Sequence, residues 1–352
     1  MTDARVLLAV DGNSLLHRAF HAQAGSGLRS ADGAPLWAVR GLLSQLVAAV
    51  ERVDPVAIVV GFDDPDSSSR RARWPQYKAG RADKADTLVA QLSSATRVLA
   101  ELGVHVVVPD GLEADDVLAS TARFAPSVDA TTVIMTSDRD AFSLIDDHTR
   151  VLRIINGGVE ASPLLTAERL VSMLGVRPDQ YRDYAALRGD ASDNLPGVRG
   201  IGPKTAAQLL SAFGSAVAVF DALAAGSSRV SELVGPARAR TLADPRSRAA
   251  WELNCQIMTM RADLPIGLDL AGGPGSLPFS PDRVRSVFER HQLTWSLRAA
   301  LRVLCDRDEP IEERPLVDDS RGWFMPAPPG GARRHAPLPP APARSDQLSL
   351  FD

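Results

Sequence analysis

The chain has 352 residues, of which 45% are hydrophobic and 23% are charged, and its formal net charge is −4. This composition is that of a globular protein with room for two or three structural units. Two cysteines exclude a disulfide framework, and no apolar run approaches the roughly 20 residues that span a membrane. We therefore expect a cytoplasmic monomer that does not contact membranes.

Apolar runs alternate with helical patterns in the first half of the chain. Strands are predicted over 6–10, 57–62, 104–108 and 132–136. Helices are predicted over 36–52, 87–102 and 114–124. Continuous runs rich in β-branched residues are typical of parallel strands that are buried on both faces. We therefore predict an α/β domain over residues 1–180 with a central, mostly parallel sheet.

Acidic residues follow these strands or begin the next helices. They are Asp11, Asp63, Glu113, Asp115, Asp116, Asp138 and Asp140, with Asp190 and Asp193 farther along the chain. The ligand crevice of a parallel sheet lies beyond the carboxyl ends of its strands, so these carboxylates should converge there. Carboxylates so close repel one another unless cations lie between them, and hard oxygen ligands favour Mg²⁺ or Mn²⁺. The pattern predicts a metal-dependent enzyme that acts on a phosphate ester.

A basic segment from Ser69 to Lys84 follows the second predicted strand. Its cations are Arg70, Arg71, Arg73, Lys78, Arg81 and Lys84, and they surround Trp74 and Tyr77. Cations meet phosphates and rings stack on bases, whereas an isolated stretch of this kind would more often be a solvated helix and loop. Its place at a strand end favours contact with a substrate. We expect DNA contacts from Arg70, Arg73, Tyr77, Lys78 and Arg81.

Helical patterns dominate from residue 181 to residue 305. Within this part, Gly200 and Gly202 permit a tight turn with positive φ, and a proline then suits the first turn of a helix. The N–H groups at such a helix start can bind a phosphate, which favours a helix-hairpin-helix gripping the sugar-phosphate backbone. Its predicted DNA contacts are Gly200, Gly202, Lys204 and Thr205. The alternative is a Gly-Pro turn between two core helices.

The composition changes again over 306–352. Seven prolines between residues 326 and 342 predict a disordered linker. After it come Gln347, Leu348, Leu350 and Phe351, and large apolar side chains gain nothing from exposure to water. The pentapeptide 347–351 resembles the short motif by which bacterial replication and repair proteins dock on the sliding clamp. The resemblance implies that Leu348, Leu350 and Phe351 fill an apolar pocket while Gln347 bonds at its rim; the alternative is a tail folded onto the core.

Taken together, the motifs resemble those of the bacterial and phage 5′ nucleases, the flap-endonuclease family, which includes the 5′-3′ exonuclease domain of DNA polymerase I. The matching segments are 10–13, 62–63, 77–81, 113–119, 137–140, 189–197 and 200–206. Their order and spacing agree over roughly residues 5–300, and all nine acidic positions of the family site are present. The resemblance implies a PIN-like sheet, a helical arch over the active site, and a helix-hairpin-helix subdomain that binds duplex DNA and K⁺. The implied substrates are 5′ flaps, nicks and gaps in DNA during replication and repair.

Hydrolysis of a phosphodiester needs an in-line water, a stabilised leaving oxygen and neutralised charge, and two metal ions roughly 4 Å apart supply all three. We expect one ion to be held or oriented by Asp11, Asp63, Glu113, Asp115 and Asp116. We expect Asp138, Asp140, Asp190 and Asp193 to serve the second ion. By the resemblance, Lys78 and Arg81 face the scissile phosphate and act with Asp115 and Asp138 as the catalytic set.

Two departures and two alternatives qualify this interpretation. Ser69 stands where the family has an aromatic residue, and no polymerase follows, which indicates a stand-alone nuclease. A haloacid-dehalogenase-like phosphatase would also use the acids at 138–140 and at 189–190, but it leaves Asp11, Asp63 and Glu113 without a role. A non-catalytic DNA-structure-binding protein with the same fold is the second alternative.

Overall fold

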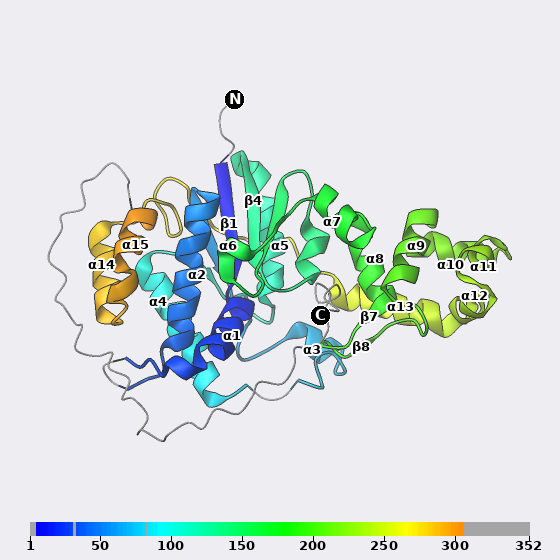
Figure 1. The fold of residues 1–352 in the computed structure, drawn as a ribbon, viewed down its shortest axis with the longest axis horizontal. Coiled ribbons are helices and arrows are strands. Elements are labelled where there is room, and N and C mark those ends of the chain that lie inside the picture. Colours follow the sequence, from blue (N-terminus) through cyan, green and yellow to red (C-terminus); the bar gives the residue numbers. More distant parts are fainter. Residues whose placement is uncertain (1–4, 31–32, 82–83, 306–352) are drawn as a thin grey trace, which may run out of the picture. The chain divides into compact units, whose positions relative to one another are not determined.

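A six-stranded sheet forms the centre of the N-terminal part of this computed structural model, which describes residues 5–30, 33–81 and 84–305 (Figure 1). Its strands are β1 (Arg5–Asp11), β2 (Ala57–Gly61), β3 (His105–Val107), β4 (Ala130–Thr136), β5 (Thr149–Arg153) and β6 (Leu164–Leu165). Their order is β3-β2-β1-β4-β5-β6, and only β6 runs antiparallel. The prediction of a mostly parallel sheet is confirmed. The predicted clamp-binding tail lies outside the described residues.

Helices cover both faces of the sheet, as the continuous apolar strands predict. On one face lie α1 (Gly12–Gln23), α2 (Trp37–Val53) and α4 (Asp86–Leu102), packed on Leu8 and Val10 of β1. On the other face, α5 (Ala114–Phe124) packs on the alternate residues Leu7 and Ala9. The short elements of this part are η1 (Ala24–Ser26), α3 (Ser69–Arg73), η2 (Ala125–Val128), η3 (Asp140–Leu144) and α6 (Gly158–Ala161). Of the expected helical arch, the described residues form α3 and the turns after it.

A helical region follows the sheet. It comprises α7 (Ala167–Leu174), α8 (Pro178–Arg188), a hairpin of β7 (Gly189–Asp190) and β8 (Leu195–Pro196), α9 (Pro203–Phe213), α10 (Ala216–Ala224), α11 (Arg229–Val234), α12 (Pro236–Ala243) and α13 (Pro245–Met258). Its core is continuous with that of the sheet, because Tyr181 of α8 and Leu209 of α9 belong to the same buried cluster as Ile134 of β4. The helices are therefore anchored directly on the sheet.

The last described helices return to the sheet. The helices α14 (Pro281–Arg290) and α15 (Thr294–Leu304) lie beside α4 and α2, and Phe288 and Leu297 are buried in their shared core (Figure 1). The predicted grouping of 181–305 as one DNA-binding unit therefore does not match how these two helices pack. Their amphipathic patterns predict a buried face but not which element covers it.

A glycine at the end of β2 sets how closely α5 approaches the strand ends. A Cβ on Gly61 would lie 2.8 Å from Cβ of Val117 and 3.1 Å from the carbonyl oxygen of Ala114. Only a residue without a side chain permits this contact. The first turn of α5, which carries acidic residues, is thereby held against the carboxyl end of the sheet.

Among the described helices, no single one is long and apolar enough to cross a membrane, and α9 with α10 meets those criteria only as a pair bent by 77°.

Candidate active site

Acids from three neighbouring strands meet in one cleft. Asp11 ends β1, Asp63 follows β2 by two residues, and Asp138 follows β4 by two residues. Together with Glu113 and Asp115 they line a cleft of about 1390 Å³. The sequence predicts that nine acids converge in one crevice; five of them line this cleft, whereas Asp116, Asp140, Asp190 and Asp193 do not.

Asp11 forms the floor of the cleft. Its carboxylate accepts a hydrogen bond from the Ser14 amide at 2.9 Å, which caps α1, and another from the Thr136 hydroxyl at 2.7 Å. Burial and the nearby carboxylates of Asp63 and Asp138 raise the pKa of Asp11 to about 7. Thr136 was not singled out in the sequence, although a polar residue that ends an apolar strand is a usable signal.

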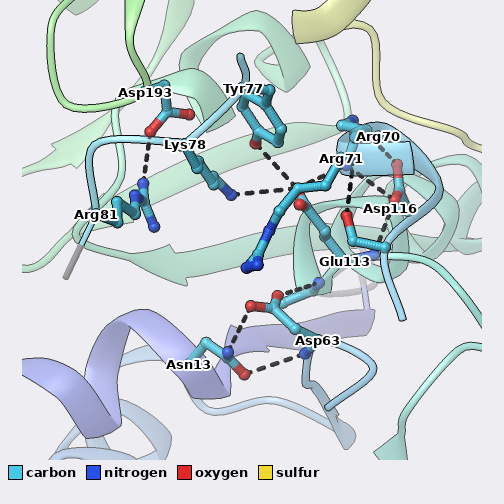
Figure 2. A network of polar contacts seen from close by, with 12 residues as sticks. Asn13, Asp63, Arg70, Arg71, Tyr77, Lys78, Arg81, Glu113, Asp116 and Asp193 are labelled. Atoms are coloured by element: carbon cyan, nitrogen blue, oxygen red, sulfur yellow. Dashed lines mark hydrogen bonds and ion pairs between the residues drawn. The ribbon is translucent and has the colours of Figure 1, made fainter. Parts of the chain in front are cut away.

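The Asp63 carboxylate, just after β2, accepts hydrogen bonds from α1 and from α5. The Asn13 side-chain amide donates to it at 2.6 Å, and the Ala114 amide at the start of α5 donates at 3.0 Å (Figure 2). In return, the Asp63 amide donates to the Asn13 side-chain oxygen at 3.1 Å. Asn13 therefore fixes the orientation of this carboxylate, a role that its sequence position alone did not indicate.

The Asp138 carboxylate affects the pKa of two other acids of the site. Burial, and next Asp138, raise the pKa of both Asp115 and Asp140 well above the ordinary value of an aspartate. Asp115 also faces Asp11, whereas Asp140 faces Asp193 and Asp190 of the β7–β8 hairpin. The two groups of acids expected from the sequence are thus linked through Asp138.

Glu113 and Asp116 already have cationic partners. They form the capping box of α5, and the Arg70 guanidinium contacts Glu113 at 2.8 Å and Asp116 at 2.6 Å (Figure 2). Burial raises the pKa of Glu113, but Lys78 and Arg70 lower it more, so the net shift is downward. Glu113 is therefore ionised, and Arg70 ties both acids to the protein.

The cations Lys78 and Arg81, predicted to be catalytic, also form ion pairs with acids of the site. The Lys78 ammonium lies 3.3 Å from Glu113, the Tyr77 hydroxyl donates to the same oxygen at 3.1 Å, and Arg81 pairs with Asp193 (Figure 2). Lys78 has φ +57°, a conformation that is rare for a side chain of its size, and its amide donates to the Asp193 carbonyl at 3.0 Å. The segment is thus held between α5 and the β7–β8 hairpin.

The hairpin that carries Asp190 and Asp193 depends on a close backbone crossing. A Cβ on Gly189, which has φ +81°, would lie 2.2 Å from the amide nitrogen of Gly197. Asp190 accepts from the Ser192 amide at 2.8 Å. Burial raises the pKa of Asp193 despite its pairing with Arg81. Both acids are therefore fixed by local geometry beside the second acidic group.

The other residues predicted to bind DNA lie in different surroundings. Arg73 is exposed and stacks 4.8 Å from the Trp74 ring, whereas Arg70 is turned inward. Arg71, which the prediction omitted, lines the cleft, and its side chain points into it (Figure 2). An exposed cation next to a buried one cannot be recognised from a short basic run.

The predicted phosphate-binding turn precedes α9 and does not line the cleft. Gly200 has φ +77°, as expected, but Gly202 has φ −94° and an extended conformation, so positive φ at Gly202 is wrong. Pro203 opens α9, and Lys204 is exposed in its first turn while Thr205 is half-buried. Gly202 occupies the N-cap, where an extended backbone is normal.

The acids of the cleft fit divalent cations by their chemistry. They offer hard oxygen ligands, and the raised pKa values of Asp11, Asp115 and Asp140 indicate a site short of positive charge. No three His, Cys, Asp or Glu side chains within residues 5–305, gaps excepted, lie close enough to hold an ion by themselves. Water or substrate oxygens would complete the coordination, as is usual for Mg²⁺.

Comparison with protein families gives two matches that together cover residues 6–274. Residues 6–175 match the model of the 5′-3′ exonuclease N-terminal resolvase-like domain. Residues 176–274 match the model of the 5′-3′ exonuclease C-terminal SAM fold. The boundary between them lies within a few residues of the predicted change from an α/β to a helical pattern at 180.

Related sequences and structures agree with these matches. DNA polymerase I of Mycobacterium tuberculosis is 34% identical over 286 residues, 80% of this chain and 30% of the polymerase. The thermostable DNA polymerase I of Thermus aquaticus is 38% identical over 268 residues, 76% of this chain and 30% of the polymerase. The chain therefore spans less than a third of the length of these relatives.

Two solved structures share the fold. T5 5′-exonuclease with bound divalent metal ions (zinc) has a TM-score of 0.58 at 18% identity and covers 85% of this chain and 100% of its own. The catalytic core of Rad2 in complex with a DNA substrate has a TM-score of 0.55 at 15% identity, covering 86% of this chain and 93% of its own. Both support the PIN-like sheet with an attached helical region.

We predict that Asp11→Asn stabilises the metal-free protein at alkaline pH. The pKa of Asp11 is about 7 in the folded state and 3.8 ordinarily, so the folded state binds the extra proton, and stability falls as pH rises through this window. Asparagine can keep the α1 cap without the charge. In EDTA near pH 8 the melting temperature should rise by about 2–6 °C, with little change near pH 4. An unchanged melting temperature near pH 8 would show that ionisation of Asp11 does not destabilise the folded protein.

Proposed function

The chain belongs to the 5′-3′ exonuclease family, and from this membership we propose that it is a divalent-metal-dependent 5′ nuclease that hydrolyses phosphodiesters in 5′ flaps, nicks and gaps of DNA. One observation carries the proposal. The cleft is lined by the acids Asp11, Asp63, Asp115 and Asp138 and also by the cations Lys78 and Arg81. A phosphodiester with its metal ions complements both kinds of charge, whereas an uncharged substrate complements neither.

We assign the two metal ions to two groups of acids, with water completing the coordination of each ion. Asp11, Asp63, Asp115 and Asp138 would hold one ion of Mg²⁺ or Mn²⁺. Asp140, Asp190 and Asp193 would serve a second, in part through water, with Asp138 between the two. Bound in this way, the ions would activate a water and neutralise the charge on the phosphate and the leaving oxygen. The raised pKa values of Asp11, Asp115 and Asp140 support this division.

Lys78 and Arg81 would position and neutralise the scissile phosphate. Burial lowers the pKa of Lys78, but Glu113 and Asp193 raise it more, so the ammonium stays charged at neutral pH. Both cations belong to a segment already fixed at two ends, so little ordering is needed when a phosphate arrives. The Tyr77 hydroxyl would keep Glu113 in place while Lys78 changes partner.

Duplex DNA would be gripped away from the acids. The turn at Gly200 places the N-terminus of α9 and the exposed Lys204 at the surface, a combination that binds phosphates without reading bases. By the family resemblance, K⁺ would bind at the same turn. The phosphatase alternative loses support, because it gives no role to Asp11, Asp63 or the α9 turn.

We predict that Asp138→Asn lowers the single-turnover cleavage rate by at least roughly 10²-fold while DNA binding persists. The charge lost is the one shared by both acidic groups. Asp64→Asn is the matched control, because the Asp64 carboxylate accepts from the Asp66 amide at 2.9 Å in its own loop and from the Gly111 amide at 2.6 Å in the segment before α5, and the variant should keep most of the activity. A near-wild-type rate for Asp138→Asn in Mg²⁺ would contradict the assigned site.

We predict that Lys204→Ala weakens DNA binding and lowers the log–log slope of affinity against salt by about one unit, since one phosphate contact is lost. Lys78→Ala should instead lower the single-turnover rate at saturating DNA. Exchanging K⁺ for Li⁺ should weaken binding in the wild type if the turn holds K⁺. If Lys204→Ala leaves both affinity and slope untouched, the turn is only structural.

We further propose, from the sequence of 347–351 alone, that the tail docks on the sliding clamp. Tethering through the tail would raise the local concentration of the nuclease at a nick. A peptide covering 341–352 should bind the cognate clamp with about micromolar affinity. Deletion of 347–352 should remove clamp binding and leave cleavage of naked flap DNA intact. Undiminished clamp binding by the truncated protein would exclude the tail as the docking element.

A further inference from the structure

We propose that Arg70 is a positioning residue of the acidic site, where it sets the first turn of α5, and that it is not a DNA contact. The proposal rests on the proposed function, because the property that it explains is the affinity of the site for divalent ions. It also differs from the sequence prediction, which placed Arg70 among the DNA contacts.

Both terminal nitrogens of the Arg70 guanidinium are engaged with the protein. Its Nη1 donates to Glu113 at 2.8 Å and to Asp116 at 3.1 Å. Its Nη2 donates to the second oxygen of Asp116 at 2.6 Å and to the Thr259 carbonyl at 3.0 Å. The side chain of Arg70 is 11% exposed and that of Asp116 is 0% exposed. A two-pronged contact of this kind fixes direction as well as distance.

Three segments that are far apart in sequence meet at this guanidinium. Arg70 belongs to α3, Asp116 to α5, and Thr259 follows α13 at the end of the helical region. Asp116 also accepts from the Arg261 amide at 2.8 Å, so the same carboxylate is held from two sides. The pairing of Arg70 with Asp116 therefore joins the basic segment, the acidic helix and the segment that follows the helical region.

Asp115 lies in the sequence between the two partners of Arg70, Glu113 and Asp116. Consecutive helical residues point about 100° apart, so a turn that commits Glu113 and Asp116 to Arg70 directs Asp115 elsewhere. Asp115 lines the cleft, as do Asp138 and Asp11. Arg70 thus neutralises two of the three acids and leaves the third to face the cleft.

The neighbouring arginine supplies a contrast within the same short helix. Arg71 is exposed, lines the cleft and points into it (Figure 2). Its position suits a contact with DNA phosphate. The two adjacent residues carry the same charge, so replacing each in turn separates positioning from DNA binding.

The test compares Arg70→Gln, Arg70→Lys and Arg71→Gln in the full chain by two measurements. The first is Mn²⁺ affinity by calorimetry without DNA. We expect a loss of about 10- to 100-fold for Arg70→Gln, partial rescue for Arg70→Lys and no change for Arg71→Gln. The second is the salt dependence of DNA binding in EDTA. The log–log slope should fall by about 0.9 for Arg71→Gln and stay unchanged for Arg70→Gln.

A stability control separates positioning from general weakening of the fold. Arg52 donates to the carbonyls of Val159 and Ser162 on the opposite side of the sheet from α5, so Arg52→Gln should lower the melting temperature without changing Mn²⁺ affinity. If Arg70→Gln does not fold, Arg70→Lys carries the same comparison, because lysine cannot reproduce the two-pronged contact.

The outcomes decide the proposal. Unchanged Mn²⁺ affinity in the Arg70 variants overturns it, whatever the slope. A slope that falls by about one unit for Arg70→Gln also overturns it, since Arg70 would then contact DNA. If the wild type binds no Mn²⁺, the proposed function fails, and that failure does not decide the role of Arg70. The role of Arg70 is then tested by the NMR signal of the Asp115 carboxyl group. An unchanged signal in Arg70→Lys overturns the proposal.

Discussion

Repulsion among carboxylates at the ends of β1, β2 and β4 is the constraint on which the rest of the site depends. Parallel neighbouring strands deliver Asp11, Asp63 and Asp138 to one edge, and α5 adds its own acids there. Such a cluster is costly in a buried setting unless positive charge is supplied. The protein supplies part of it by pairing Arg70 with two acids of α5, and leaves Asp115 and Asp140 with raised pKa values.

The same ion pairs also hold the architecture of the cleft. Lys78 and Arg81 attach the basic segment to Glu113 on one side and to Asp193 on the other. These pairs are partly buried, so their loss would leave uncompensated charge and would be felt in both the sheet and the helical region. The same ion pairs therefore balance the charge of the site and fix its geometry. This explains why cations from a loop reach so far into an acidic cleft.

Much of the fold and most of the acidic site can be predicted from the sequence, because both depend on strong local patterns. Long apolar runs specify β1, β2 and β4, and acids placed directly after such runs must share an edge when the strands are parallel. The weaker elements β5 and β6 were not predicted, since β5 carries charged residues at 150 and 153 and β6 has only two residues. The return of α14 and α15 to α2 and α4 depends on tertiary packing, which periodicity does not encode.

Side-chain partners were the least predictable feature. Nothing in a run of three arginines and aromatic neighbours shows that Arg70 turns inward while Arg71 points into the cleft; only the positions of Asp116 and Thr259 decide it. Likewise, positive φ was expected at both turn glycines, but the N-cap geometry of α9 requires an extended Gly202. Such details depend on how distant segments meet, whereas the acidic pattern depends only on the strands themselves.

The most direct test of the account is cleavage of a 5′-flap DNA by the purified chain with Mg²⁺ and with EDTA, alongside p-nitrophenyl phosphate as a simple phosphomonoester. The account predicts cleavage of the flap DNA in Mg²⁺, none in EDTA, and no turnover of the phosphomonoester. DNA that is bound but never cut in Mg²⁺, or turnover of p-nitrophenyl phosphate alone, would contradict it.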